Sequence, residues 1–145
     1  MGARHRGALV TNVERKSGYL LASKISDRKA FRVSQAIGRQ FHRIPKTLRK
    51  TITFDRGKEF SEHQVLAEKT QLEVYFTDPY CSWQRGTNEN TNGLLRQFFP
   101  KGTDFTLIKY HQVARATRML NDRPRQRLGY KTPSEVLSRY LDCCH

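Results

Sequence analysis

The order of β-rich and helical segments is the feature that most constrains the fold of this chain. Two apolar, β-rich runs at residues 7–13 and 19–25 flank a turn-like segment and predict an antiparallel hairpin. Further β-rich runs are expected at 51–54 and 73–76, and helices at about 27–44, 61–70, 87–99 and 107–120. A hairpin followed by alternating helices and strands predicts an α/β protein with a mixed sheet covered by helices.

Apolar residues within the helical patterns identify the faces that we expect to be buried. Ser26 or Asp27 is the expected N-cap of the first helix, and Pro45 follows its end. A turn at 128–130 and a short helix opening at 132–135 complete the chain. The expected core residues of the first three helices are Phe31, Ile37, Phe41 and Ile44; Val65 and Leu66; and Leu94, Leu95, Phe98 and Phe99.

The net charge of +14 on 145 residues predicts a polyanionic partner, and DNA is the first candidate. The charge is uneven, because residues 1–50 and 101–145 are strongly basic while 51–100 contain 7 acidic and 5 basic residues. An acidic centre between basic flanks suits a cation site on a DNA-binding surface; solvated helix faces are the simpler alternative for the flanks. No apolar run suits a membrane span or a signal peptide, so a cytoplasmic protein is expected.

Cysteine usage gives no sign of a metal site. The three cysteines, Cys81, Cys143 and Cys144, have no CxxC spacing, and incidental reduced thiols are the expected interpretation.

Two carboxylates, Asp55 and Glu89, are candidate metal ligands for phosphodiester chemistry. Asp55 ends the β-rich run at 51–54, and Glu89 lies near the start of the helix expected at 87–99. Carboxylates fixed on a strand end and a packed helix are suitable ligands for two Mg²⁺ or Mn²⁺ ions about 4 Å apart. Arg96 follows Glu89 by two helical turns and suits a phosphate, and Gly93 leaves the same face open. The alternatives are a surface charge at Arg96 and a packing glycine at Gly93.

Three segments carry a resemblance to a known family. They are residues 53–60 (TFDRGKEF), residues 78–104 (DPYCSWQRGTNENTNGLLRQFFPKGTD), and residues 120–125 (LNDRPR) with 128–133 (LGYKTP). Together they resemble the catalytic core of DDE-type bacterial insertion-sequence transposases, specifically insertion-sequence family thirty. The resemblance implies an RNase H-like mixed sheet shared with retroviral integrases, and cutting and joining of DNA with Mg²⁺ or Mn²⁺.

The resemblance also assigns roles and boundaries. Asp55 matches the family's second acid, Glu89 its third, and Arg96 the basic residue that follows. Residues 1–121 would form the integrase-like core, and 122–145 a basic tail with a short helix. The full-length form is expected to act on transposon ends and target DNA as a homo-oligomer, in the bacterial cytoplasm at the nucleoid. Lys58, Tyr80, Trp83 and Arg85 flank the expected cleft and are candidate DNA contacts, although core packing is equally consistent with the two aromatic residues.

Two departures from the family pattern bear on activity. The family's first Asp lies on an opening strand, and this chain starts after the position of that residue. Arg56 replaces the Asn that usually follows the second acid, and its guanidinium would pair with Asp55 and compete with a cation. Other acids are not expected to replace the missing first Asp, which lies on a strand. Glu14 lies in a turn and Asp27 near a helix cap, and Asp78 before Pro79 suits a turn.

These departures leave two functional hypotheses. The first is a transposase catalytic core that is impaired alone because its first catalytic Asp and opening strand are absent. The alternative is a non-catalytic DNA-binding remnant of a transposase.

Overall fold

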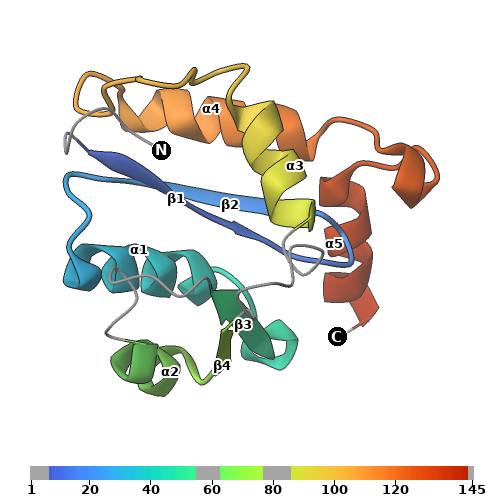
Figure 1. Ribbon diagram of the computed structural model, residues 1–145. Helices are drawn as coiled ribbons and strands as arrows, with labels where there is room; N and C mark the ends of the chain where they lie inside the picture. The colour runs from blue at the N-terminus through green and yellow to red at the C-terminus, as the bar shows by residue number, and fades with distance from the viewer. Residues whose placement is uncertain (1–6, 55–62, 77–85, 144–145) are drawn as a thin grey trace.

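The computed structural model describes residues 7–54, 63–76 and 86–143 of the chain (Figure 1). The described part contains four strands and five α-helices. Their bounds are β1 Ala8–Val13, β2 Leu20–Ile25, α1 Ala30–His42, β3 Thr51–Phe54, α2 His63–Thr70, β4 Glu73–Phe76, α3 Gly86–Leu95, α4 Tyr110–Asn121 and α5 Pro133–Cys143. None of the helices described is long and apolar enough to cross a membrane.

The predicted hairpin is confirmed. β1 pairs antiparallel with β2 in a register that runs from Ala8 opposite Ile25 to Val13 opposite Leu20. Glu14 closes the connecting turn, because its carboxylate accepts hydrogen bonds from the backbone N–H groups of Lys16 (2.9 Å) and Ser17 (2.7 Å) and from the Ser17 hydroxyl.

The strands at 51–54 and 73–76 are also confirmed, and β3 pairs parallel with β4. The described residues therefore contain one antiparallel and one parallel strand pair. Within the described residues, however, the strands form two separate two-stranded sheets, β1–β2 and β3–β4, rather than one continuous sheet.

Helices cover both faces of the hairpin. α1 lies on one face, and α3 and α4 lie on the other (Figure 1). The first hydrophobic cluster lies under α1 and α2 and includes residues of both sheets: Ala8, Ile25, Val33, Ala36, Ile37, Ile52, Phe54, Leu66 and Leu72. The second cluster lies under α3 and α4: Leu9, Leu20, Leu95, Phe99, Phe105, Val113, Ala116 and Leu120.

Buried amide side chains tie the helices to the hairpin. Gln40 of α1 donates to the Val10 carbonyl (3.1 Å) and the Ser23 hydroxyl (2.9 Å), and accepts from Asn12 (2.7 Å). Each bond satisfies a group that burial removes from water, so Gln40 fixes the end of α1 against both strands.

Helix boundaries and some burial predictions differ from expectation. α1 begins at Ala30 after Lys29, not at Ser26 or Asp27, because the Asp27 carboxylate accepts a bond from the Lys29 N–H ahead of the helix. α3 ends at Leu95, and α4 begins at Tyr110, not Leu107. Three residues expected in the core are at least one-third exposed: Phe31, Val65 and Phe98.

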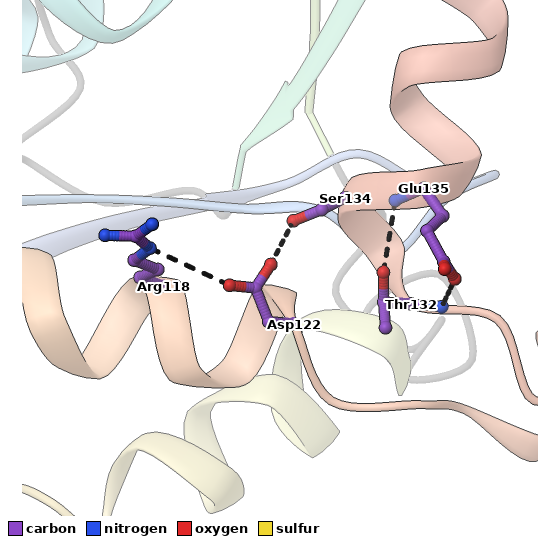
Figure 2. A network of polar contacts seen from close by, with 5 residues as sticks. All are labelled: Arg118, Asp122, Thr132, Ser134 and Glu135. Atoms are coloured by element: carbon purple, nitrogen blue, oxygen red, sulfur yellow. Dashed lines mark hydrogen bonds and ion pairs between the residues drawn. The ribbon is translucent and has the colours of Figure 1, made fainter.

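Polar contacts join α4 to α5 (Figure 2). The Ser134 hydroxyl donates to the Asp122 carboxylate (2.8 Å), which lies 3.8 Å from the Arg118 guanidinium. Thr132 and Glu135 cap α5 reciprocally, since Thr132 Oγ1 accepts from the Glu135 N–H and the Glu135 carboxylate accepts from the Thr132 N–H. The short C-terminal helix is thus confirmed and is longer than expected, extending to Cys143.

Candidate metal and nucleic-acid site

Helix α3 is firmly held by its buried face. Leu95 is fully buried in the second cluster, and buried Thr91 donates its hydroxyl to the Thr87 carbonyl (2.8 Å). The Thr11 hydroxyl of β1 donates to the Asn92 side chain (3.1 Å). A helix that is packed on two sides presents its remaining side chains in a fixed direction, which a ligand site requires.

The exposed face of α3 continues into the turn that follows it and carries Glu89, Gly93 and Arg96. At 3.6 residues per turn these positions lie within about 60° of one another around the helix axis. A Cβ atom added at Gly93 would meet no described atom within 4 Å, so packing does not require glycine there. The open surface between Glu89 and Arg96 therefore agrees with the first of the two interpretations of Gly93.

The residues next to both predicted acids line one cavity. This cavity, which we call the β1–β3 cavity, lies between β1, β3 and the first turns of α3. Phe54, which precedes Asp55, and Asn88, which precedes Glu89, are both in its lining. Asp55 itself lies outside the described residues, as do Lys58, Tyr80, Trp83 and Arg85.

Of the two predicted metal ligands, only Glu89 is among the described residues. They contain no group of three or more His, Cys, Asp or Glu side chains placed to hold an ion. Glu89 is exposed and forms no ion pair among them, so its hard oxygen atoms are available to Mg²⁺ or Mn²⁺. Of the predicted ligands, Glu89 fits such an ion, and Asp55 would have to complete the set.

The Glu14 carboxylate is occupied by hydrogen bonds within the hairpin turn. Burial opposes ionisation of its carboxyl, but the hydrogen bonds from Ser17 and the backbone of Lys16 outweigh burial and lower its pKa from the ordinary value of 4.5. Asp27 likewise bonds its own loop. Both residues therefore have local structural roles, as their sequence context predicted.

Arginines after α4 pack against the hairpin turn. Arg127 donates to the carbonyl groups of Arg15 and Lys16 at 3.4 Å. Partial burial, with a further contribution from neighbouring Arg123 and Arg127, lowers the pKa of Arg125. Part of the basic charge of the C-terminal region therefore has a structural role.

Three polar residues near the site were missed by sequence reasoning, namely Thr11, Asn88 and Asn92. The density of Asn in an interior helix was the available signal, because Asn is a poor helix former. The structure gives Asn92 a partner on β1 and leaves the buried Asn88 Oδ1 without a hydrogen-bond partner among the described residues.

Comparison with known proteins identifies similar sequences. The chain is 41% identical over 142 residues to the transposase for insertion sequence element IS4351 of Bacteroides fragilis, covering 98% of this chain and 43% of that protein. It is 43% identical over 131 residues to transposase InsI for insertion sequence element IS30A of Escherichia coli K12, covering 90% of this chain and 34% of that protein. The chain thus spans less than half the length of these relatives. No protein-family model matches it.

A solved structure shares the fold. The catalytic core domain of BIV integrase superposes with a TM-score of 0.73 at 21% sequence identity, covering 100% of this chain and 96% of that chain. The predicted fold class, an RNase H-like α/β integrase core, is therefore confirmed.

Proposed function

Since the homologues of this chain are IS30-family and other insertion-sequence transposases, we propose that it forms part of the catalytic core of a DNA transposase. In the full-length form this core would cleave phosphodiester bonds and transfer DNA strands. Asp55 and Glu89 would be the acidic ligands that this chain contributes.

The shared lining of the β1–β3 cavity is the observation that carries this proposal. Phe54 and Asn88 are 34 positions apart in the sequence and line the same cavity. Asp55 and Glu89 follow these two residues directly in the sequence. This supports a site to which the end of β3 and the first turn of α3 each contribute one carboxylate.

Mg²⁺ or Mn²⁺ held by these carboxylates would supply Lewis-acid activation of the attacking and leaving oxygens. The chain's own residues would position the groups around the reaction. Leu95 and Thr91 hold α3 in place, and the Thr11–Asn92 bond fixes it to β1, so the Glu89 carboxylate would be directed from a rigid support.

DNA is the proposed substrate, and the charge of the chain supports it. The net charge of +14 favours a phosphate backbone, and exposed Arg96 extends the face of Glu89. We propose Arg96 as a phosphate contact, together with Lys58, Tyr80, Trp83 and Arg85, which lie outside the described residues. Assembly of the full-length protein into a homo-oligomer is part of the same proposal.

Nicking of supercoiled plasmid in Mg²⁺ or Mn²⁺ tests the catalytic part. Cutting by the 145-residue chain that is lost in Glu89→Ala would support an enzyme. The control is Glu68→Ala, which removes an exposed carboxylate on α2 and should keep the same rate.

Metal-directed cleavage of the protein tests the ligands without activity. Fe²⁺ with ascorbate and peroxide generates hydroxyl radicals that cut the backbone beside a bound ion. Cuts near residues 55 and 89 that Mg²⁺ suppresses and that Glu89→Ala removes would support the metal site even if the chain nicks no DNA. Absence of both nicking and local cuts, with DNA binding retained, would refute the proposal and favour the non-catalytic DNA-binding remnant.

DNA affinity as a function of salt tests the role of Arg96. Each lost phosphate contact should lower the slope of log K against log salt by about 1. Arg96→Ala should therefore lower both affinity and slope, whereas Arg32→Ala on α1, with the same change of charge, should alter them less. Equal effects of the two variants would exclude a specific contact at Arg96.

A further inference from the structure

The segment between α4 and α5 projects from the body of the molecule (Figure 1). Residues 123–131 of this segment, which we call the basic loop, contain four basic residues and no acidic one: Arg123, Arg125, Arg127 and Lys131. They also contain Tyr130, whose side chain is 71% exposed. None of the DNA contacts proposed above belongs to this loop.

Backbone hydrogen bonds fix the shape of the basic loop. The Arg125 N–H donates to the Lys131 carbonyl (3.0 Å), and the Arg125 carbonyl accepts from the Tyr130 N–H (2.9 Å). At the base of the loop the Ser134 hydroxyl donates to the Asp122 carboxylate (2.8 Å), which joins α4 to α5 (Figure 2). The side chains of the loop therefore start from a defined backbone.

Tyr130 has a backbone conformation that is costly for a tyrosine. Its φ angle is 63°, in the left-handed region that favours glycine and asparagine. Packing does not offset this cost, because the exposed ring forms no hydrogen bond or ring contact with the residues that the structure describes. By contrast, Lys24 lies over the ring of Tyr110, which is also exposed. The fold therefore gives the Tyr130 ring no structural role that would explain the strained backbone.

Positive charge is concentrated around Arg125. Burial and, to a smaller extent, the charges of Arg123 and Arg127 lower the pKa of Arg125. Carbonyl oxygens hold two of these guanidinium groups, since Arg125 donates to Leu120 (3.3 Å) and Arg127 to the hairpin turn (3.4 Å). Arg123 is exposed. An anion at Arg123 would reduce the repulsion among the three arginines.

The hairpin turn links the basic loop to the first turn of α3. Arg127 bonds the carbonyl groups of Arg15 and Lys16 in that turn. The same two turn residues line the β1–β3 cavity together with Asn88, which precedes Glu89. A DNA strand held near Glu89 can therefore continue past the hairpin turn to the basic loop.

We propose that the basic loop binds single-stranded DNA, with the Tyr130 ring stacked on one unpaired base and Arg123 and Lys131 on the flanking phosphates. An exposed aromatic ring among cations is the combination that binds single strands without reading their sequence. Cleavage of a phosphodiester bond creates a free strand end, whose bases leave the duplex at a lower cost than internal ones. The loop would hold such an end. This inference rests on the proposed DNA substrate but not on the proposed metal site.

Comparison of a normal and an abasic strand tests stacking without metal. The probes are an oligothymidylate of about 10 nucleotides and an abasic strand of equal length, which keeps the phosphates and lacks the bases. The 145-residue chain should bind the oligothymidylate about tenfold more tightly, and Tyr130→Ala should reduce that preference about fivefold or more. Tyr130→Phe keeps the ring and should retain the preference. Tyr110→Ala is the matched control, because Tyr110 is 72% exposed, and should retain it too.

Tyr130→Asn separates binding from folding. Asparagine tolerates the left-handed conformation, so this variant should melt at or above the temperature of the wild-type chain. It should nevertheless lose its preference for oligothymidylate, as Tyr130→Ala does. A ring that packs against the protein would give the opposite result for stability.

Arg123→Ala tests the phosphate contact. This variant should bind both strands more weakly by the same factor and should reduce the magnitude of the slope of log K against log salt by about 0.7. Arg32→Ala on α1, with the same change of charge, is the control and should alter the slope less. Equal slopes for the two variants would remove Arg123 from the site.

Three outcomes would overturn the inference as a whole. They are equal or absent binding of the two strands by the wild-type chain, an undiminished preference in Tyr130→Ala, and a marked loss of stability in Tyr130→Asn. Duplex binding through Arg96 and nicking through Glu89 can persist in each of these cases, so the proposed transposase core would stand. Absence of binding to single-stranded and duplex DNA alike would overturn both proposals.

Discussion

Asn121, at the end of α4, bonds both backbone polar groups of Leu20 on β2. The Leu20 N–H donates to Asn121 Oδ1 (2.8 Å), and Asn121 Nδ2 donates to the Leu20 carbonyl (2.9 Å). Both residues are almost completely buried. The side-chain amide of Asn121 thus satisfies backbone hydrogen-bonding groups at the outer edge of β2, as a neighbouring strand would.

Asn121→Ala should destabilise the protein, because it leaves two buried backbone groups unpaired at about 1–3 kcal/mol each. Chemical denaturation gives the free energy of unfolding. Asp122→Ala is the neighbouring control and should cost about 1 kcal/mol or less, since its contacts to Arg118 and Ser134 are exposed (Figure 2). Equal costs for both variants would contradict the assigned role of Asn121.

Glu14→Gln should change the dependence of stability on pH. The folded carboxyl has a lowered pKa, so its contribution to stability is present above the ordinary value of 4.5 and is lost as pH falls through the folded value. The difference in unfolding free energy between wild type and Glu14→Gln should therefore shrink below about pH 4.5. Ser17→Ala, which keeps the carboxyl but removes one of its donors, should reduce the effect without abolishing it. A difference that stays constant down to about pH 2 would contradict this assignment.

Gly93→Ala should raise stability and lower DNA affinity. Alanine favours a helix over glycine by about 0.5–1 kcal/mol, and the added Cβ meets no described atom within 4 Å. DNA affinity should fall by about three- to tenfold if the face between Glu89 and Arg96 contacts DNA. Gly38→Ala on α1 is the matched control, since its Cβ is equally unobstructed, and should stabilise without loss of affinity. A stable Gly93→Ala protein with full affinity would remove this face from the DNA surface.

Leu95→Ala should destabilise by about 2–5 kcal/mol, because it opens a cavity in the fully buried centre of the second cluster. Leu107→Ala removes the same atoms from a residue that is 79% exposed and should change stability by about 0.5 kcal/mol or less. Thermal melts of the two variants give a direct comparison. A small effect of Leu95→Ala would show that α3 is not anchored as described.

Local patterns predicted the strands well because β-branched and aromatic residues dominate short runs such as 51–54. They failed where two local signals competed. Ser26 and Asp27 are good N-caps, but the Asp27 carboxylate bonds the loop and Lys29 precedes the helix without a side-chain cap. Val65 and Leu66 are neighbours on a helix, so only one faces the core, and only the packing of α2 decides that it is Leu66.

Long-range polar contacts were not predictable from one sequence. Asn121 and Leu20 are 101 positions apart, and Gln40 bonds residues 17 to 30 positions away. Nothing local to Asn121 or Gln40 indicates burial. Glu89 and Arg96 fall on one exposed face, as their spacing predicted, while the assignments of Asp55, Lys58, Tyr80, Trp83 and Arg85 remain predictions for residues outside those described.

The division of the core into two clusters on opposite faces of the hairpin also governs how this sequence can change. Substitutions in separate clusters share no partners, so their effects on stability should add with little coupling. Ile37 of α1 and Leu120 of α4 can therefore be replaced without compensating changes on the opposite face of the hairpin. The side chains of the two clusters can therefore be substituted independently, whereas the backbone of β1 and β2 has to remain compatible with both clusters.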